Sequence, residues 1–477
     1  MLSAVGLLAL VSAQPNLIYI MADDLGYREL GCFGQSKIPT PHLDRLAKEG
    51  IRITRAYAGS PVCAPTRYSL LTGKHQGHAA IRGNKEQGGF GPNDKEGQTP
   101  VDQGEVLLSE VLKKGGYRTG IVGKWALGGS TIGQFPTEHG FDFFYGYLCQ
   151  RRAHNFYPPY LWRNTDVDLL NNPVYAAHQK VTMPFSDSEE YWRRYAGTTY
   201  SAGKLADACV EFIRDKDRSK PFFLYYAPTL PHVALQAPKE WVNRFPREWD
   251  SKPYLGENGY LPSERPRATY AAMIAYLDHT VGQILEALEQ SDHAKDTLII
   301  FTSDNGATNV GGVDRDFFQS NGELRAGKMS LYEGGIRVPM VARWPGKIAP
   351  GTESDHPLTC YDAMSTLCEA AGVKAPKSDG LSYVDALVGK RQKSRPFLYF
   401  EYPEAAAFQA VIMGRYKVIR PNLKRNLSQV EVYDLEADPS EARDLASARP
   451  DLVREGLAIM RREHVRNNDF PLGLVDK

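Results

Sequence analysis

Short apolar runs alternate with amphipathic segments along most of the chain. The runs have the length and composition of buried strands and lie at residues 16–22, 119–125, 221–228 and 297–303. The amphipathic segments have helical periodicity and lie at residues 40–50, 105–117, 201–216 and 269–290. The first of these predicts a helix with Thr40 as its N-cap. The alternation predicts an α/β fold with a mostly parallel central sheet and helices on both faces.

The pattern changes near residue 385. Three segments there are typical of antiparallel strands, at residues 394–402, 406–420 and 431–439, and a final helix follows from about Pro450. We therefore expect a catalytic domain over residues 15–384 and a smaller antiparallel sheet-plus-helix subdomain over residues 385–477.

Composition narrows the class of protein. Of 477 residues, 42% are hydrophobic and 24% are charged, as in ordinary globular proteins. The 57 basic residues nearly cancel 56 acidic ones, so the basic surplus of a nucleic-acid binder is absent. None of the six cysteines forms a CxxC pair, which argues against a zinc cluster. The sequence does not decide whether one or two disulfides form among these cysteines.

Residues 1–14 form a short apolar stretch that ends in small residues. This is typical of a signal peptide cleaved after Ala13, although the usual positive start is missing; the alternative is a buried first strand. We favour export, to the periplasm or the medium. No later run reaches the roughly 20 apolar residues that a membrane span needs.

Acidic and amide side chains follow two of the expected strands. Asp23 and Asp24 follow the first, and Asp304 and Asn305 follow the last. Ligands bind beyond the carboxyl ends of such strands, and hard oxygen ligands suit calcium or magnesium. The alternative is that these are ordinary turn sequences, since Asp, Asn and Gly favour turns.

The segment PVCAPTRYSLLTG places Cys63 just before a proline at the start of a helix. Arg67 lies one helical turn further on, on the same side, so an anion at Cys63 would meet both the helix N-terminus and a guanidinium. A buried structural cysteine is the alternative, and the residues alone leave the two about equal.

This segment resembles the sulfatase signature C-x-P-x-R with its Leu-Thr-Gly ending, and GYRTGIVGK at residues 116–124 resembles the second signature of that family. The resemblance covers nearly the whole chain. It implies an alkaline-phosphatase-like fold and a sulfuric ester hydrolase in which Cys63 is oxidised to formylglycine by a maturation enzyme. It also implies a single calcium ion bound by Asp23, Asp24, residue 63, Asp304 and Asn305.

The hydrated aldehyde has two hydroxyls. One attacks sulfur, and the other lets the adduct collapse and expel sulfate, which gives covalent catalysis its second step. The resemblance assigns Lys124 and Lys328 to the sulfate, and these cations would neutralise charge on its oxygens. It implies that His232 contacts sulfate and protonates the leaving oxygen.

One position departs from the family pattern: the chain reads GKWALG, so Ala126 stands where relatives carry a histidine. We expect another group to substitute, and His75 and His78 in TGKHQGH are the nearest in sequence to the nucleophile helix. The alternative is a catalytically weakened carbohydrate-binding relative.

The segment at residues 146–164 is rich in aromatic, Arg, His and Asn side chains, a mixture that suits a sugar. Arg151, Arg152 and His154, together with His78, are its substrate-binding candidates, and an ordinary aromatic loop is the alternative. The sequence resembles bacterial polysaccharide sulfatases, so we expect a sulfated saccharide, of galactose type. A phosphatase or phosphodiesterase of the same superfamily is the runner-up; it would need zinc and more His ligands.

Overall fold

The computed structural model describes residues 14–87, 96–131, 133–175, 177–178, 185–186, 188–215 and 220–477. The expected signal peptide therefore lies outside the described residues, except for Gln14. The larger sheet has the order β10-β2-β9-β8-β1-β7-β3-β4-β5-β6, with β11 beside β2. Its strands are β1 Asn16–Ala22, β2 Ile51–Tyr57, β3 Arg118–Lys124, β4 Phe143–Tyr147, β5 Tyr160–Arg163, β6 Asp166–Leu169, β7 Phe222–Ala227, β8 Thr297–Ser303, β9 Arg337–Arg343, β10 Thr352–Ser354 and β11 Leu358–Thr359.

The centre of this sheet is parallel, as the alternating pattern predicts. β1 pairs in parallel with β7 and β8, and β3 pairs in parallel with β4 and β7. β9 runs antiparallel between β8 and β2, and β5 and β6 form an antiparallel edge. The sheet is therefore mixed but mostly parallel around β1.

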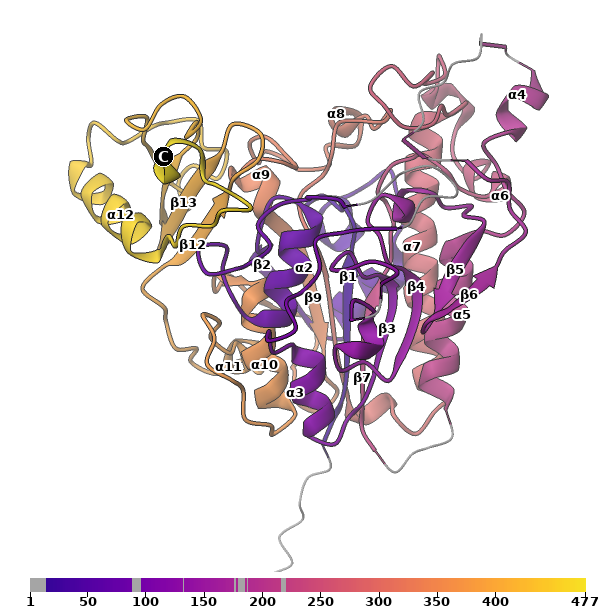
Figure 1. Ribbon diagram of the computed structural model, residues 1–477, viewed down its shortest axis with the longest axis horizontal. Coiled ribbons are helices and arrows are strands. Elements are labelled where there is room, and N and C mark those ends of the chain that lie inside the picture. Colours follow the sequence, from indigo (N-terminus) through magenta and orange to yellow (C-terminus); the bar gives the residue numbers. More distant parts are fainter. Residues whose placement is uncertain are drawn as a thin grey trace, which may run out of the picture.

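Helices cover both faces of the sheet (Figure 1). Ile18 and Ile20 of β1 pack with α1, α5 and α7, whereas Leu17 and Tyr19 pack with α2, α3 and α10. This division follows from the alternation of side chains along a strand. The helices are α1 Pro41–Lys48, α2 Cys63–Thr72, α3 Leu108–Lys114, α4 Glu189–Arg193, α5 Ser201–Arg214, α6 Lys239–Val242, α7 Pro266–Glu289, α8 Arg315–Phe318, α9 Glu333–Ile336, α10 Ala363–Ala370, α11 Val384–Leu387 and α12 Pro450–Glu463.

The C-terminal part forms a second, antiparallel sheet with the order β12-β13-β14-β15, and α12 packs on it. Its strands are β12 Leu398–Tyr402, β13 Phe408–Met413, β14 Tyr416–Arg420 and β15 Glu431–Asp434. The segment 406–420 is a hairpin that turns at Gly414, whose φ is +59°.

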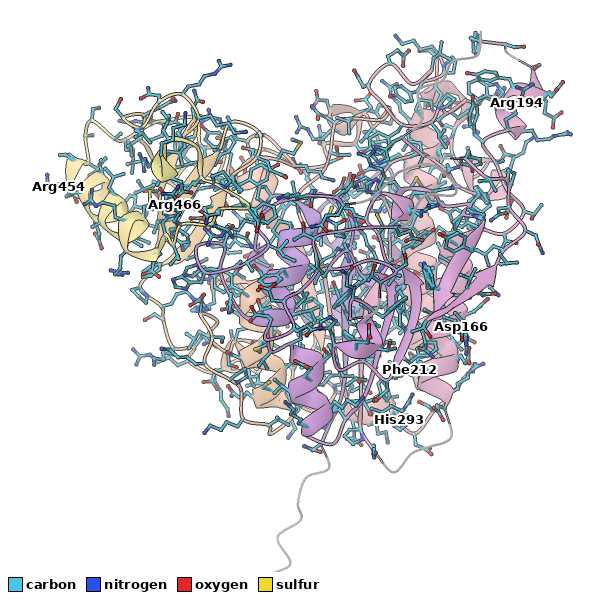
Figure 2. The ribbon with its side chains drawn as sticks, viewed as in Figure 1. Asp166, Arg194, Phe212, His293, Arg454 and Arg466 are labelled. Atoms are coloured by element: carbon cyan, nitrogen blue, oxygen red, sulfur yellow. The ribbon has the colours of Figure 1, made fainter. Side chains whose placement is uncertain are left out.

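The second sheet lies beside α2 and α9 of the larger unit (Figure 1). Leu398 and Phe400 of β12 join one hydrophobic cluster with Tyr57 and Ile336. Arg454 and Arg466 belong to this C-terminal part, and Figure 2 shows them on the side of the molecule away from Asp166 and Arg194. This cluster packs the C-terminal sheet against β2 and α9 of the larger unit.

All six cysteines lie in the described residues and are free thiols, so no disulfide forms among them. Within the described residues, no helix combines the length and the apolar character needed to cross a bilayer.

Candidate active site

Cys63 is the first residue of α2 and is fully buried. Its Sγ lies 3.2 Å from Asp23 Oδ1 and 3.7 Å from Lys328 Nζ. Burial raises the pKa of the Cys63 thiol well above its usual value, and the nearby Asp23 adds to this effect. The thiol is therefore neutral and is not an activated thiolate. In the structure, Cys63 lies at a helix N-terminus and faces acidic oxygens, as predicted.

The acidic side chains come from the ends of two adjacent strands. β1 and β8 pair in register up to Ala22 and Ser303, which brings the following residues side by side. The Asp24 N–H donates to Asp304 Oδ1 at 3.1 Å, and Asn305 Nδ2 donates to Asp24 Oδ1 at 2.8 Å. Asp23, Asp24, Asp304 and Asn305 are all fully buried.

Three cations neutralise these acids. Lys124, the last residue of β3, lies 2.7 Å from Asp23 Oδ2, and Lys328 lies 2.7 Å from Asp24 Oδ1. Arg67 reaches Asp304 Oδ2 at 2.8 Å. The fold thus brings both predicted lysines and the predicted arginine close to Cys63, from β3, from α2 and from the loop between α8 and α9.

The acids differ in their protonation. Burial opposes ionisation of Asp23, but the Lys124 ammonium, with further cations, holds its pKa well below the usual range. Burial and the Asp23 carboxylate raise the pKa of Asp304 to about 7. The two buried carboxylates of Asp23 and Asp304 repel each other, and a bound cation would relieve this repulsion.

The oxygen atoms suit a hard divalent cation. Three carboxylates converge there, and the buried Asn305 Oδ1 has no hydrogen-bond partner among the described residues. A buried, unpaired amide oxygen is costly unless a ligand satisfies it. Carboxylate and amide oxygens are what calcium prefers, so the predicted ligands fit a calcium ion.

His232 belongs to the same cluster, because its Nε2 lies 3.5 Å from Asp24 Oδ2 and close to Asp23 and Cys63. Its Nδ1 donates to the carbonyl of Val233, so Nε2 carries the lone pair and accepts from Lys328 Nζ at 3.1 Å. Burial lowers the pKa of His232 to about 4. His232 is therefore a neutral ring that is hydrogen-bonded to the lysine beside Cys63.

His154 stacks on His232 with the ring centres 3.7 Å apart. Its Nδ1 lies 2.5 Å from His178 Nε2, and burial lowers its pKa well below the usual value. His154, one of the substrate-binding candidates, is therefore in direct contact with a residue of the site.

The structure does not bring His75 or His78 to Cys63. Both follow the C-terminal end of α2, in a segment that folds back along the helix, where Gln76 Nε2 donates to the carbonyl of Pro65 at 3.0 Å. His75 Nε2 faces Glu463 at 3.3 Å, and His78 Nδ1 faces Asp379 at 3.0 Å. These acids are the partners that the structure gives the two histidines, and the expectation that one of them substitutes for a histidine at Ala126 stays a prediction.

Arg151 and Arg152 lie beside this region but have acidic partners. Arg151 Nε is 2.7 Å from Glu86, and Arg152 Nε is 3.6 Å from Glu96. Both arginines line a pocket with Tyr160, Trp162 and Tyr175. Sequence reasoning missed the two glutamates, since neither belongs to a periodic element.

Comparisons with known proteins agree with this geometry. Residues 15–373 match the family described as Sulfatase, and residues 325–455 match the C-terminal family of N-sulphoglucosamine sulphohydrolase. The chain is 33% identical over 426 residues to N-acetylgalactosamine-6-sulfatase of Mus musculus, with 87% of this chain and 74% of the relative covered. It is 29% identical over 506 residues to N-acetylgalactosamine-6-O-sulfatase of Bacteroides thetaiotaomicron, with 93% and 92% covered. The crystal structure of Ps i-CgsB in complex with k-i-k-neocarrahexaose superposes with a TM-score of 0.74 at 27% identity, over 94% of this chain and 92% of that one.

Proposed function

Given that this chain belongs to the sulfatase family and is a sulfuric ester hydrolase, we propose that it removes sulfate from a sulfated carbohydrate by means of a formylglycine made from Cys63 and one bound calcium ion. The observation that carries the proposal is the convergence on Cys63 of three carboxylates, two lysines and one arginine, of which all but Lys328 are fully buried.

Oxidation of Cys63 supplies a nucleophile that the neutral thiol is not. In the hydrated aldehyde, one hydroxyl oxygen bonds to sulfur while the bond from sulfur to the ester oxygen breaks. The second hydroxyl then loses its proton, the C=O bond re-forms, and the bond from carbon to the sulfate oxygen breaks. Water adds to the aldehyde and restores the hydrate.

The leaving sugar oxygen needs a proton, because an alkoxide is a poor leaving group. Lys328 Nζ lies 3.7 Å from Cys63 Sγ and donates a hydrogen bond to His232 Nε2 at 3.1 Å. We assign the donation to this pair, with His232 ready to take up the proton again.

The ligands of the calcium ion would be Asp23, Asp24, Asp304, Asn305 and residue 63. When bound, the ion would draw charge away from the sulfate oxygens. Lys124 and Arg67 are buried and preorganised on the other side of these acids, so they supply fixed positive charge without reorganisation.

The substrate class rests on the relatives and on the pocket beside His154. The two relatives named above are N-acetylgalactosamine 6-sulfatases, and the Ps i-CgsB structure holds k-i-k-neocarrahexaose. Aromatic rings next to Arg151 and Arg152 suit a sugar ring with an anionic or hydroxyl-rich neighbour. We propose a 6-sulfated sugar of galactose type.

Export and maturation complete the proposal. We propose that residues 1–13 direct the chain out of the cytoplasm, to the periplasm or the medium, and that a maturation enzyme oxidises Cys63.

Metal replacement tests the proposal. After treatment with a chelator, hydrolysis of 4-nitrophenyl sulfate should stop, and Ca²⁺ should restore it while Zn²⁺ should not; elemental analysis should find one calcium per chain. Two zinc ions per chain, with faster turnover of phosphate esters than of sulfate esters, would instead establish the phosphatase alternative.

A further inference from the structure

The N-terminal turn of α2 lacks a cap from its own sequence. Val62 occupies the N-cap position and has no polar side chain. Helices leave their first N–H groups without partners inside the helix, and here those groups adjoin the nucleophile at Cys63. Another part of the chain must satisfy them.

Asn84 supplies the missing acceptor. Its Oδ1 accepts a hydrogen bond from the Ala64 N–H at 3.1 Å. Ala64 is the next residue after Cys63, so this bond fixes the peptide that sets the direction of the nucleophile. A Ser, Thr, Asn or Asp cap normally comes from the residue before the helix; here it comes from 20 residues further on.

Glu404 in turn fixes Asn84. The Asn84 N–H donates to Glu404 Oε1 at 3.0 Å, and the Tyr402 hydroxyl donates to Glu404 Oε2 at 3.3 Å. Tyr402 is the last residue of β12, and it is fully buried. The contact thus runs from the C-terminal sheet to the first turn of α2.

Gly83 shows that the approach of Glu404 is a tight fit. A Cβ on Gly83 would lie 2.6 Å from Glu404 Oε1 and 2.8 Å from its Cδ. A side chain at residue 83 would therefore displace the carboxylate from its present position. This short contact is an observation separate from the hydrogen bonds. It indicates that residues 83–84 pack tightly against the Glu404 side chain.

We infer that Asn84 and Glu404 are positioning residues that orient residue 63 through the N-terminal turn of α2, and that the C-terminal sheet thereby takes part in catalysis. The inference rests on the proposed function, since it concerns the same nucleophile. Neither residue needs to touch the sugar to act in this way.

The test compares two substrates: 4-nitrophenyl sulfate, which has no sugar, and N-acetylgalactosamine 6-sulfate. Asn84→Ala and Glu404→Ala should lower kcat on both by the same factor, about fivefold to tenfold, because one positioning hydrogen bond is lost. KM should change little. Rates are divided by the fraction of residue 63 that intact mass shows to be oxidised, so that a defect in maturation is not counted as a defect in turnover.

Glu404→Gln is the matched control, because its amide oxygen can still accept from the Asn84 N–H; it should stay within twofold of the unaltered protein. Gly83→Ala should act like Glu404→Ala, since the added methyl displaces the carboxylate. Thermal unfolding of each variant shows whether it is folded, and Gly83→Ala provides a second variant if one of the others is not.

Losses limited to the sugar substrate would overturn the inference and make Asn84 and Glu404 sugar contacts. Unchanged kcat in Asn84→Ala, or an equal loss in Glu404→Gln, would also overturn it. Failure of the oxidised, unaltered protein to hydrolyse either sulfate ester would contradict the proposed function instead, which keeps the two outcomes distinct.

Discussion

Single side chains near Cys63 owe their protonation to burial and to one or two neighbours. Burial keeps the thiol neutral and lowers the pKa of His232 to about 4. Lys328 remains charged, because although burial disfavours its charge, Asp24 raises its pKa well above the usual value. The site therefore combines neutral groups that can move a proton with fixed cations that can hold an anion.

Cys63→Ala removes the group that would become the nucleophile and should lower turnover more than about a thousandfold. The fold should persist, because the change removes one small buried atom. Cys209→Ala is the matched control: Cys209 is also fully buried, and it lies on α5 in the hydrophobic cluster that includes residues of α7. It should keep its turnover. Sulfate release under saturating substrate measures both, and comparable losses in the two variants would exclude a special role for Cys63.

Residues that end a periodic element could be predicted from the sequence, and residues in irregular loops could not. Asp23 and Asp304 follow apolar runs, so their meeting at one sheet edge follows from the topology. Asn84 and Glu404 follow no periodic pattern, because their partners are chosen by packing between distant loops. Ala126 has φ +59° and no polar side chain, and nothing in its sequence context indicates which imidazole would approach the site.

The helices α1 and α2 share a feature at the scale of elements: each has its first turn capped by a different part of the chain. Thr40 was expected to cap α1, yet its side chain makes no cap bond and its Oγ1 accepts from the Gly31 N–H at 2.8 Å. Asp278 of α7 takes its place and accepts from the N–H groups of His42 and Leu43. Sequence locates such helices well, but only packing decides what caps them.

Asp278 should make stability depend on pH. Burial raises its pKa to about 7, so the folded protein holds a proton that the unfolded chain, with an ordinary carboxyl pKa, has already lost. Its contribution to stability is therefore greatest below about pH 4 and falls as pH rises to about 7. Asp278→Asn should remove this fall and gain about 1–3 kcal/mol over the unaltered protein between pH 5 and pH 7.5.

Denaturant unfolding at a series of pH values measures this change. Glu289→Gln, on the exposed side of the same helix where Glu289 pairs with Arg45 at 2.9 Å, is the control and should leave the pH dependence unaltered. A parallel pH profile for Asp278→Asn and the unaltered protein would show that Asp278 ionises normally when folded.

The whole molecule joins its two sheets through apolar packing and a buried ion cluster. Lys417 of β14 lies 3.1 Å from Glu333 of α9 and 2.9 Å from Glu441, and all three are almost fully buried. The alkaline-phosphatase-like fold and the small antiparallel sheet expected from the sequence are confirmed. The boundary at residue 385 stays a prediction. The ion cluster was not foreseen, because residues far apart in sequence form it.

Lys417→Met removes the buried cation that Glu333 and Glu441 share and leaves Glu333 only the longer pair with Arg337 at 3.6 Å, so it should lower the free energy of unfolding by about 3–5 kcal/mol. Arg415→Met is the control, since Arg415 pairs with Asp434 at 2.6 Å on the surface, where water screens the pair, so its loss should change stability far less. Denaturant unfolding measures both. If the two variants lose the same amount, the cluster does not hold the sheets together.

The chemical state of residue 63, measured together with sulfate release, tests the central claim most directly. Preparations oxidised to different extents can be made by expressing the chain with more or less maturation enzyme, and intact mass gives the oxidised fraction of each. We expect the rate of sulfate release from N-acetylgalactosamine 6-sulfate to rise in proportion to that fraction and to vanish when it is zero. Full activity in a preparation that carries only the Cys63 thiol would contradict the account.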